Sequence, residues 1–323
     1  MVLRKEMVIV RRKTFVLASI LAVMVIGLSL RIYGVSDFKE SDFVNINSPE
    51  NLQRISSKVL DDTGRGTYIS PDYIKEITVY TGDITGDGAE DKILLLNFGP
   101  DISLIAVYAA ADNGYEYLGE LGLLSNVTAL EIKRLAAENR DIIAIKEEAA
   151  QQLGSYEYNV FVRGYLWNGD RFINIISIPE TIEADWNKLW DNESVQWNKV
   201  RHNAQISWEG IDNPKVYTSE HQEYFVSSDK TNKNIPADDT YTLQNSRDIY
   251  QAFTWSDEFN AFVLEVRNDL ISGERVGVVE NLNNSPYYIV PEYEQYLNKY
   301  RVITKNGDII IRQNTELSEP LAF

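Results

Sequence analysis

Short hydrophobic runs alternate with polar turn signals from Ile77 to near the C-terminus. The runs are rich in β-branched and aromatic residues, as strands are: ITVYT, KILLL, ISLIAVYAAA, YEYLGEL, IIAIK, YEYNVFVRGYLW, RFINIISI, AFVLEV, RVIT and DIIIRQ. Three of the turns contain Asn-Gly, which tolerates positive φ and is a strong hairpin signal: Asp112-Asn113-Gly114, Asn168-Gly169-Asp170 and Asn306-Gly307-Asp308. We therefore predict a mainly β domain of antiparallel hairpins over residues 76–323.

The hairpins repeat faintly along the chain. Ile77 and Asp91 are 14 positions apart, as are Val127 and Asp141, and each aspartate leads into an aliphatic run. Repeat units of roughly 50 to 60 residues, each a small antiparallel sheet, are typical of a β-propeller, and this chain has room for about five blades. A β-sandwich in which similar hairpins coincide is the alternative.

Helical spacing interrupts the β pattern in a few places. Pro49 to Asp61 predicts a short helix with Ser48 as its N-cap. Pro179 to Trp197 predicts an amphipathic helix, because the positions i, i+4, i+7 and i+8 hold Ile182, Trp186, Leu189 and Trp190. Glu292 to Tyr300 predicts another short helix, and the polar stretch Ser227 to Asp239 predicts an exposed loop.

The N-terminal region contains one long hydrophobic segment, Thr14 to Leu30, without a charge over 17 positions. As a helix, 17 to 22 residues would span roughly 26 to 33 Å, which matches a bilayer core. The basic residues before it favour a cytoplasmic N-terminus. We predict a cytoplasmic tail (1–13), a single-pass transmembrane signal-anchor (14–35), a juxtamembrane segment with a short helix (36–75) and an extracytoplasmic β-repeat domain (76–323). A cleaved signal peptide and a buried soluble helix are the alternatives.

Charge separates at this segment. The first 31 residues hold six Lys/Arg and one Asp/Glu, which leaves 25 basic and 47 acidic residues in the rest, a net charge of about -22. Such a surface repels nucleic acid and anionic lipid, and it favours divalent cations or cationic partners. The chain has no cysteine, which excludes a disulfide scaffold and a lipid-modified N-terminal cysteine.

The sharpest chemical motif is GDITGDGAED, residues 82–91, which we call the acidic loop. Counting from Asp83 as position 1, oxygen-bearing side chains stand at positions 1, 3, 5 and 9, and Gly88 stands at position 6. Calcium prefers six to eight oxygen ligands, and a tight loop supplies them when alternate side chains turn inward. An EF-hand would need a glutamate at position 12, but Leu94 stands there. The loop therefore predicts a calcium site that is not an EF-hand.

A loop that ends on an aspartate at position 9 and enters a strand at once resembles the calcium loops of FG-GAP and VCBS-type repeats, found in integrin α propellers and bacterial surface proteins. The resemblance covers GDITGDGAEDKILLL. It implies a Ca²⁺ ion held by the side chains of Asp83, Thr85, Asp87 and Asp91 and by the carbonyl of Ala89.

The chain departs from this family pattern in two respects. Thr85 replaces the more usual Asp or Asn, and the Phe-Gly and Gly-Ala-Pro signatures are absent from their expected places, which argues against integrin-like ligand recognition. The second copy, with Lys133, Leu135, Ala137 and Asp141 at the ligand positions, is expected to bind no metal. The alternative for the acidic loop itself is a turn stabilised by Asx hydrogen bonds without an ion.

Catalytic motifs are missing from the sequence. His202 and His221 lie in neither a protease-like nor a deaminase-like context, and no phosphate-binding glycine loop or nucleophile elbow is present. We interpret both histidines as surface residues without a catalytic role. The tryptophans Trp186, Trp190 and Trp197 could stack on a sugar polymer, but the helical spacing of Trp186 and Trp190 favours burial of these two. A pair of glycosidase carboxylates is defined by distance in space and leaves no sequence signal.

These observations predict a membrane-tethered, extracytoplasmic, calcium-binding β-repeat module that binds or scaffolds at the cell envelope and is not an enzyme. The expected partners are the membrane, through the N-terminal helix, and a cell-envelope protein or polysaccharide. The alternative is a cell-wall or polysaccharide-directed enzyme on a β scaffold.

Overall fold

The computed structural model describes residues 37–99, 101–152, 155–187, 196–210, 214–227, 234–291 and 298–321. The predicted tail and anchor (1–13 and 14–35) lie outside these ranges. Among the described residues, no helix combines the length and the apolar character that crossing a membrane requires.

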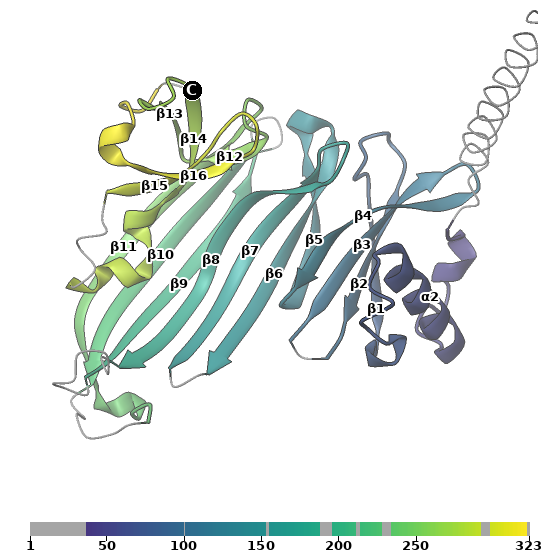
Figure 1. Cartoon of the computed structure of the whole chain (residues 1–323), viewed down its shortest axis with the longest axis horizontal. Coiled ribbons are helices and arrows are strands. Elements are labelled where there is room, and N and C mark those ends of the chain that lie inside the picture. The colour runs from purple at the N-terminus through teal and green to yellow at the C-terminus, as the bar shows by residue number, and fades with distance from the viewer. Residues whose placement is uncertain are drawn as a thin grey trace, which may run out of the picture.

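Antiparallel strands dominate the described residues and confirm the prediction of a mainly β protein (Figure 1). They form three sheets, and within each sheet every strand pairs with its neighbours in sequence. The first sheet contains β1 (Ile77–Gly82), β2 (Asp91–Asn97), β3 (Ser103–Ala111) and β4 (Gly114–Leu124). The second contains β5 (Asn126–Leu135), β6 (Arg140–Gln152), β7 (Tyr156–Trp167), β8 (Phe172–Asn187), β9 (Trp197–Glu209), β10 (Lys215–Ser227), β11 (Tyr241–Ser256) and β12 (Ala261–Val263). The third contains β13 (Glu265–Asn268), β14 (Arg275–Asn281), β15 (Lys299–Ile303) and β16 (Ile309–Gln313).

The described strands form no propeller, contrary to the prediction of about five blades. Sixteen strands in successive meanders of four match the strand content of blades. However, β8 pairs with β9 from Thr181↔Asn203 to Asn187↔Trp197. This backbone ladder joins the second and third meanders into one open eight-stranded sheet. In a propeller, these two meanders would be separate blades without hydrogen bonds between their backbones.

The first sheet is buried on both faces. The helix α2 (Pro49–Asp62) covers one face with Ile55, Val59 and Leu60. The other face packs against β5 and β6, in a cluster of Ile93, Leu95, Ile105, Val107, Val127, Leu130, Ile143 and Ile145. Burial on both faces explains why β2 contains the continuous aliphatic sequence ILLL. The first and second sheets therefore pack face to face at this place, as the two sheets of a β-sandwich do.

The predicted helix at Pro49 is confirmed, and it ends at Asp62, one residue later than expected. Ser48 is its N-cap, although the Ser48 side chain makes no capping hydrogen bond. Short 3-10 turns complete the described elements: η1 (Glu40–Phe43), η2 (Pro71–Tyr73), η3 (Ala136–Glu138), η5 (Asp238–Thr240), η6 (Leu282–Asn284), η7 (Pro286–Ile289) and η9 (Asn314–Glu316).

The helix predicted from Pro179 to Trp197 is wrong wherever the structure describes it. β8 continues to Asn187, and β9 begins at Trp197. Residues four apart share a face in a strand as well as in a helix, so Ile182 and Trp186 fit both patterns. Pairing with β7 and β9 decides in favour of the strand. Leu189 and Trp190 lie outside the described residues.

At the C-terminal end, the helix predicted from Glu292 to Tyr300 is wrong at its last two positions, because β15 begins at Lys299. Residues 292–297 lie outside the described part. The predicted loop from Ser227 to Asp239 contains no strand between Asn234 and Ala237.

All three predicted Asn-Gly turns connect paired strands. They join β3 to β4, β7 to β8 and β15 to β16. Gly169 (φ 97°) and Gly307 (φ 84°) take the positive φ that such turns require.

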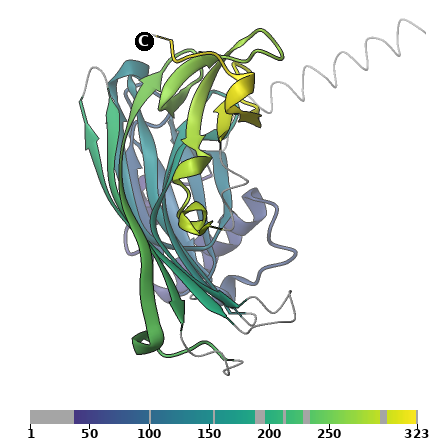
Figure 2. The same cartoon turned by 90° about the vertical axis from the view of Figure 1, so that its left-hand side faces the viewer.

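The long strands of the second sheet curve, and the third sheet with residues 282–289 lies over one face (Figure 2). Lys133 of β5 and Trp208 of β9 show how strong the curvature is. Their Nζ atom and ring centroid are 5.5 Å apart, although β6, β7 and β8 separate the two strands. In a flat sheet, four strand spacings would amount to roughly 19 Å.

Close packing between the first two sheets depends on Gly82. A Cβ atom there would lie 2.6 Å from Cγ2 of Ile132 and 3.0 Å from Oδ2 of Asp141. We expect Gly82→Ala to lower the free energy of unfolding by roughly 1 to 3 kcal/mol, as overpacking does. Urea unfolding of the full chain measures this. Thr81→Ala, at the exposed neighbouring position, is the control, and equal stability of the two variants would contradict the packing argument.

Candidate functional site

The acidic loop forms the turn between β1 and β2, and the pairing of Gly82 with Asp91 closes it. Oδ1 of Asp83 accepts hydrogen bonds from the backbone N–H groups of Gly86, at 2.8 Å, and Gly88, at 3.2 Å. Gly86 (φ 81°) and Gly88 (φ 87°) adopt the positive φ that favours glycine. The predicted ligand Asp83 is therefore turned into a tight loop.

Asp91 is fully buried, at 0 % exposure. Its Oδ2 accepts the backbone N–H of Thr85 at 2.9 Å, and its Oδ1 accepts that of Ala110, also at 2.9 Å. Burial raises the pKa of Asp91, although these N–H groups and the nearby Thr85 hydroxyl oppose the shift. That hydroxyl is buried too, and no described group makes a well-formed hydrogen bond with it.

Asp87 is exposed, and its Oδ1 accepts the backbone N–H of Ala89 at 2.8 Å, as in an Asx turn. Among the described residues, no three His, Cys, Asp or Glu side chains gather closely enough to hold a metal ion. Asx-type hydrogen bonds stabilise the loop, as predicted by the alternative of an acidic turn without an ion. The calcium site stays a prediction.

The acidic loop is tied to the turn between β5 and β6. The Asp83 N–H donates to Oδ2 of Asp141 at 2.9 Å, and the Asp141 N–H donates to the Asp83 carbonyl at 2.7 Å. We call these two bonds the Asp83–Asp141 clasp. It joins the first sheet to the second, through the aspartates that the sequence spacing relates.

Arg134 of β5 adds a charge to the clasp, and sequence patterns gave no sign of it. Its Nη1 lies 3.3 Å from Oδ2 of Asp83 and 3.3 Å from Oδ1 of Asp141. Burial alone would raise the pKa of Asp83, but the N–H groups of Gly88 and Gly86 and the Arg134 guanidinium outweigh it and lower that pKa.

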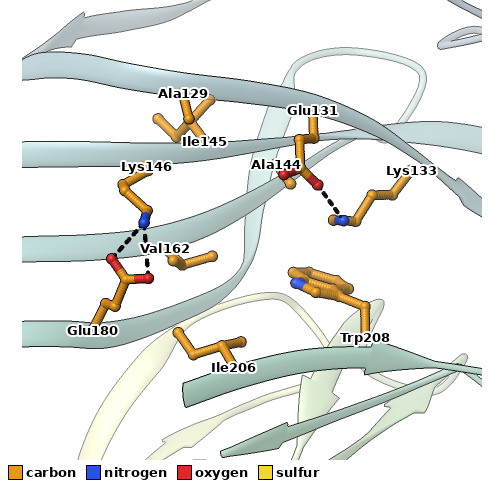
Figure 3. Close-up of a pocket in the computed structure, with 10 residues that line it drawn as sticks. All are labelled: Ala129, Glu131, Lys133, Ala144, Ile145, Lys146, Val162, Glu180, Ile206 and Trp208. Carbon is orange, nitrogen blue, oxygen red and sulfur yellow. Dashed lines mark hydrogen bonds and ion pairs between the residues drawn. The ribbon is translucent and has the colours of Figure 1, made fainter. Parts of the chain in front are cut away.

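A small hollow of about 190 Å³ lies where β5 to β9 curve together (Figure 3). Its polar side chains are already paired, since Lys146 contacts Glu180 at 2.7 Å and Lys133 contacts Glu131 at 2.5 Å. The Trp208 ring faces Lys133. These pairs leave the hollow without an unmatched charge.

A buried polar network crosses β9, β10 and β11. Nε2 of His202 lies 3.0 Å from the Pro179 carbonyl, and its Nδ1 lies 3.2 Å from Nε2 of Gln222. Arg247 donates to Oε1 of Gln222 at 2.8 Å. These distances assign a neutral His202 that donates through Nε2 and accepts through Nδ1.

Sequence reasoning placed His202 on the surface, which is wrong, because its side chain is 0 % exposed. Burial lowers the pKa of His202, against the opposing effects of the Pro179 carbonyl and the Glu220 carboxylate. The predicted surface position is confirmed for His221, which is half-exposed and lies 2.7 Å from Asp248. That hydrogen bond raises the pKa of His221.

The tryptophans divide between core and groove. Trp197 is fully buried. Trp186 is half-buried, and its ring centroid lies 6.2 Å from that of Tyr287. Together with Tyr156 and Tyr288 these rings line an open groove of about 370 Å³.

The buried His202 predicts a pH dependence of stability. Because the folded pKa is lower than the unfolded value of about 6.5, the unfolded chain takes up the proton first as the pH falls. We expect the free energy of unfolding to fall between about pH 7.5 and pH 5.5, by up to roughly 1.4 kcal/mol per pH unit. Urea unfolding across this range measures the slope.

In the same experiment, His202→Gln should reduce the slope. His221→Gln is the matched control. Because folding raises the pKa of His221, this residue stabilises the folded chain as the pH falls, so its replacement should not reduce the slope. A His202→Gln chain with the unaltered slope would show that another group is responsible.

No protein-family model matches this chain, and no curated protein sequence matches it. The resemblance to FG-GAP and VCBS-type repeats therefore rests on the acidic loop and the hairpin spacing alone.

Proposed function

We propose that the protein is a membrane-tethered, calcium-binding β module that binds or scaffolds at the cell envelope. The observation that carries this proposal is the position of the acidic loop. It is the joint between two sheets, held by the Asp83–Asp141 clasp, and its sequence contains three aspartates, Asp83, Asp87 and Asp91. An ion bound in it would act as a structural element rather than a reactive centre.

The donor chemistry of the loop fits calcium. Asp83, Asp87 and Asp91 supply carboxylates, Thr85 supplies a buried hydroxyl without a well-formed hydrogen bond, and Ala89 supplies a carbonyl. In the described part of the chain, no Lys or Arg forms an ion pair with Asp87 or Asp91. A divalent cation would supply a positive charge to these two carboxylates. Because the carboxylates are not gathered in this structure, binding requires side chains of the loop to rearrange.

The membrane tether rests on the hydrophobic segment 14–30 and the basic residues before it. Such an anchor would expose the acidic domain to an environment where calcium is plentiful, so a site of modest affinity would be filled. The expected partner is an envelope protein or polysaccharide.

The alternative of a polysaccharide-directed enzyme needs two carboxylates that face one groove. Glu157 and Asp185 both border the aromatic groove. However, Glu157 pairs with Ala184 and Asp185 pairs with Tyr156, so the two acids point to opposite faces of the sheet. The groove therefore favours stacking on a sugar over hydrolysis.

Calorimetric titration of the full chain with calcium tests the proposal. We expect heat of binding and, at a calcium concentration of about 100 times Kd, a stabilisation of roughly 2.7 kcal/mol against urea. Asp87→Ala should lose both effects without unfolding, because Asp87 is exposed.

Asp112→Ala, in the exposed turn between β3 and β4, is the matched control and should bind calcium normally. Neither heat nor stabilisation at about 10 mM calcium, well above the range of extracellular calcium modules, would end the calcium proposal.

A further inference from the structure

A second site lies away from the acidic loop, where residues 282–289 cross over the second sheet (Figure 2). We call this segment the strap. Gln222 donates to the Asn284 carbonyl at 2.6 Å, and Arg247 donates to the Ser285 carbonyl at 2.9 Å. Since η7 also contacts β9, β10 and β11, the buried network fixes the strap to the sheet.

A cavity of about 280 Å³ opens between the strap, the second sheet and β14. At about 20 to 30 Å³ per non-hydrogen atom, it has room for a ligand of roughly ten such atoms. Its apolar lining comes from several elements: Phe161, Ile178, Ile182, Phe253 and Val279. This lining suits a compact hydrophobic body.

Three charged residues line the cavity. Glu280 and Arg301 pair with each other at 2.6 Å, and Glu220 is a carboxylate only 4 % exposed. Its Oε1 accepts hydrogen bonds from Thr218, at 2.8 Å, and from Gln251, at 2.5 Å. Its Oε2 lies 4.0 Å from Nδ1 of His202, beyond hydrogen-bond distance. In the described part of the chain, no group donates a hydrogen bond to Oε2.

Hydrogen bonds from neighbouring side chains fix the orientation of the Glu220 carboxylate. Asn284 of the strap donates to Oε1 of Gln251 at 3.1 Å, which orients the Gln251 amide towards Glu220. The nearby cation Arg247 uses Nε for Gln222 and Nη2 for Ser285. A buried anion with an unused oxygen is costly unless a strong donor meets it.

We propose that the cavity binds a small organic cation, a primary ammonium on a hydrophobic body, with the ammonium at Oε2 of Glu220. A charge-assisted hydrogen bond to a carboxylate is about twice as strong as a neutral one. Phe253 is also among the lining residues, and an aromatic ring can attract a cation. The chain's net charge of -17 raises the local concentration of cations. This inference does not depend on calcium in the acidic loop.

Calorimetric titration of the full chain with 2-phenylethylammonium, and separately with the neutral 2-phenylethanol, tests the proposal. We expect the ammonium to bind at least about tenfold more tightly than the alcohol. Glu220→Gln keeps the shape of the side chain and should abolish this preference. Glu223→Gln changes an acid on the other face of β10 and should preserve it.

Two results would overturn the proposal: a preference that persists in Glu220→Gln, which would assign it to the general acidic surface, or no binding of either compound. If Glu220→Gln fails to fold, Val279→Phe, which fills the cavity from β14 and leaves the network intact, decides instead. Binding of the ammonium weakened about tenfold or more in Val279→Phe supports the cavity as the site, and unchanged binding contradicts it.

Discussion

The architecture of this protein depends on the Asp83–Asp141 clasp. Two hydrogen bonds, each with an aspartate backbone N–H as donor, hold the β1–β2 turn against the β5–β6 turn. Gly82 permits the approach, because any side chain there would collide with Ile132. With the turns fixed, the inner faces of the first and second sheets close over a shared aliphatic core. The rest of the second sheet then extends from β5 as one continuous ladder.

Local chemistry predicted the features that depend on neighbouring residues. The Asn-Gly turns specify hairpins because glycine and asparagine tolerate positive φ, and all three are hairpins in the structure. The equal spacing that relates Asp91 to Asp141 also has a structural meaning. Asp91 is the first residue of β2, and Asp141 is the second residue of β6. Each carboxylate accepts a hydrogen bond from a backbone N–H of the acidic loop.

Features set by distant pairing were beyond such reasoning. Ile182 and Trp186 fit a helix and a strand equally well, and the pairing of β8 with β9 decides between them. In β10, polar residues occupy both faces, so hydropathy gives no sign that Glu220 and Gln222 point inward. His202 joins them only because β9 lies beside β10. Alternate polar residues in a long strand lie on the same face. Which of the two faces is buried follows only from the strands and the strap that pack against it.

The two candidate sites differ in their physics. In the acidic loop, Arg134 pairs with Asp83, and Asp87 and Asp91 have no such partner among the described residues. The cavity under the strap instead combines an apolar lining with the buried carboxylate of Glu220 and a second acid, Glu280, that pairs with Arg301. The central claim is that calcium completes the joint. Amide hydrogen exchange of the full chain, with and without calcium, tests it most directly at the N–H groups of Asp83, Gly86 and Asp141. The account predicts slower exchange of all three in calcium, and exchange rates that calcium leaves unchanged would contradict it.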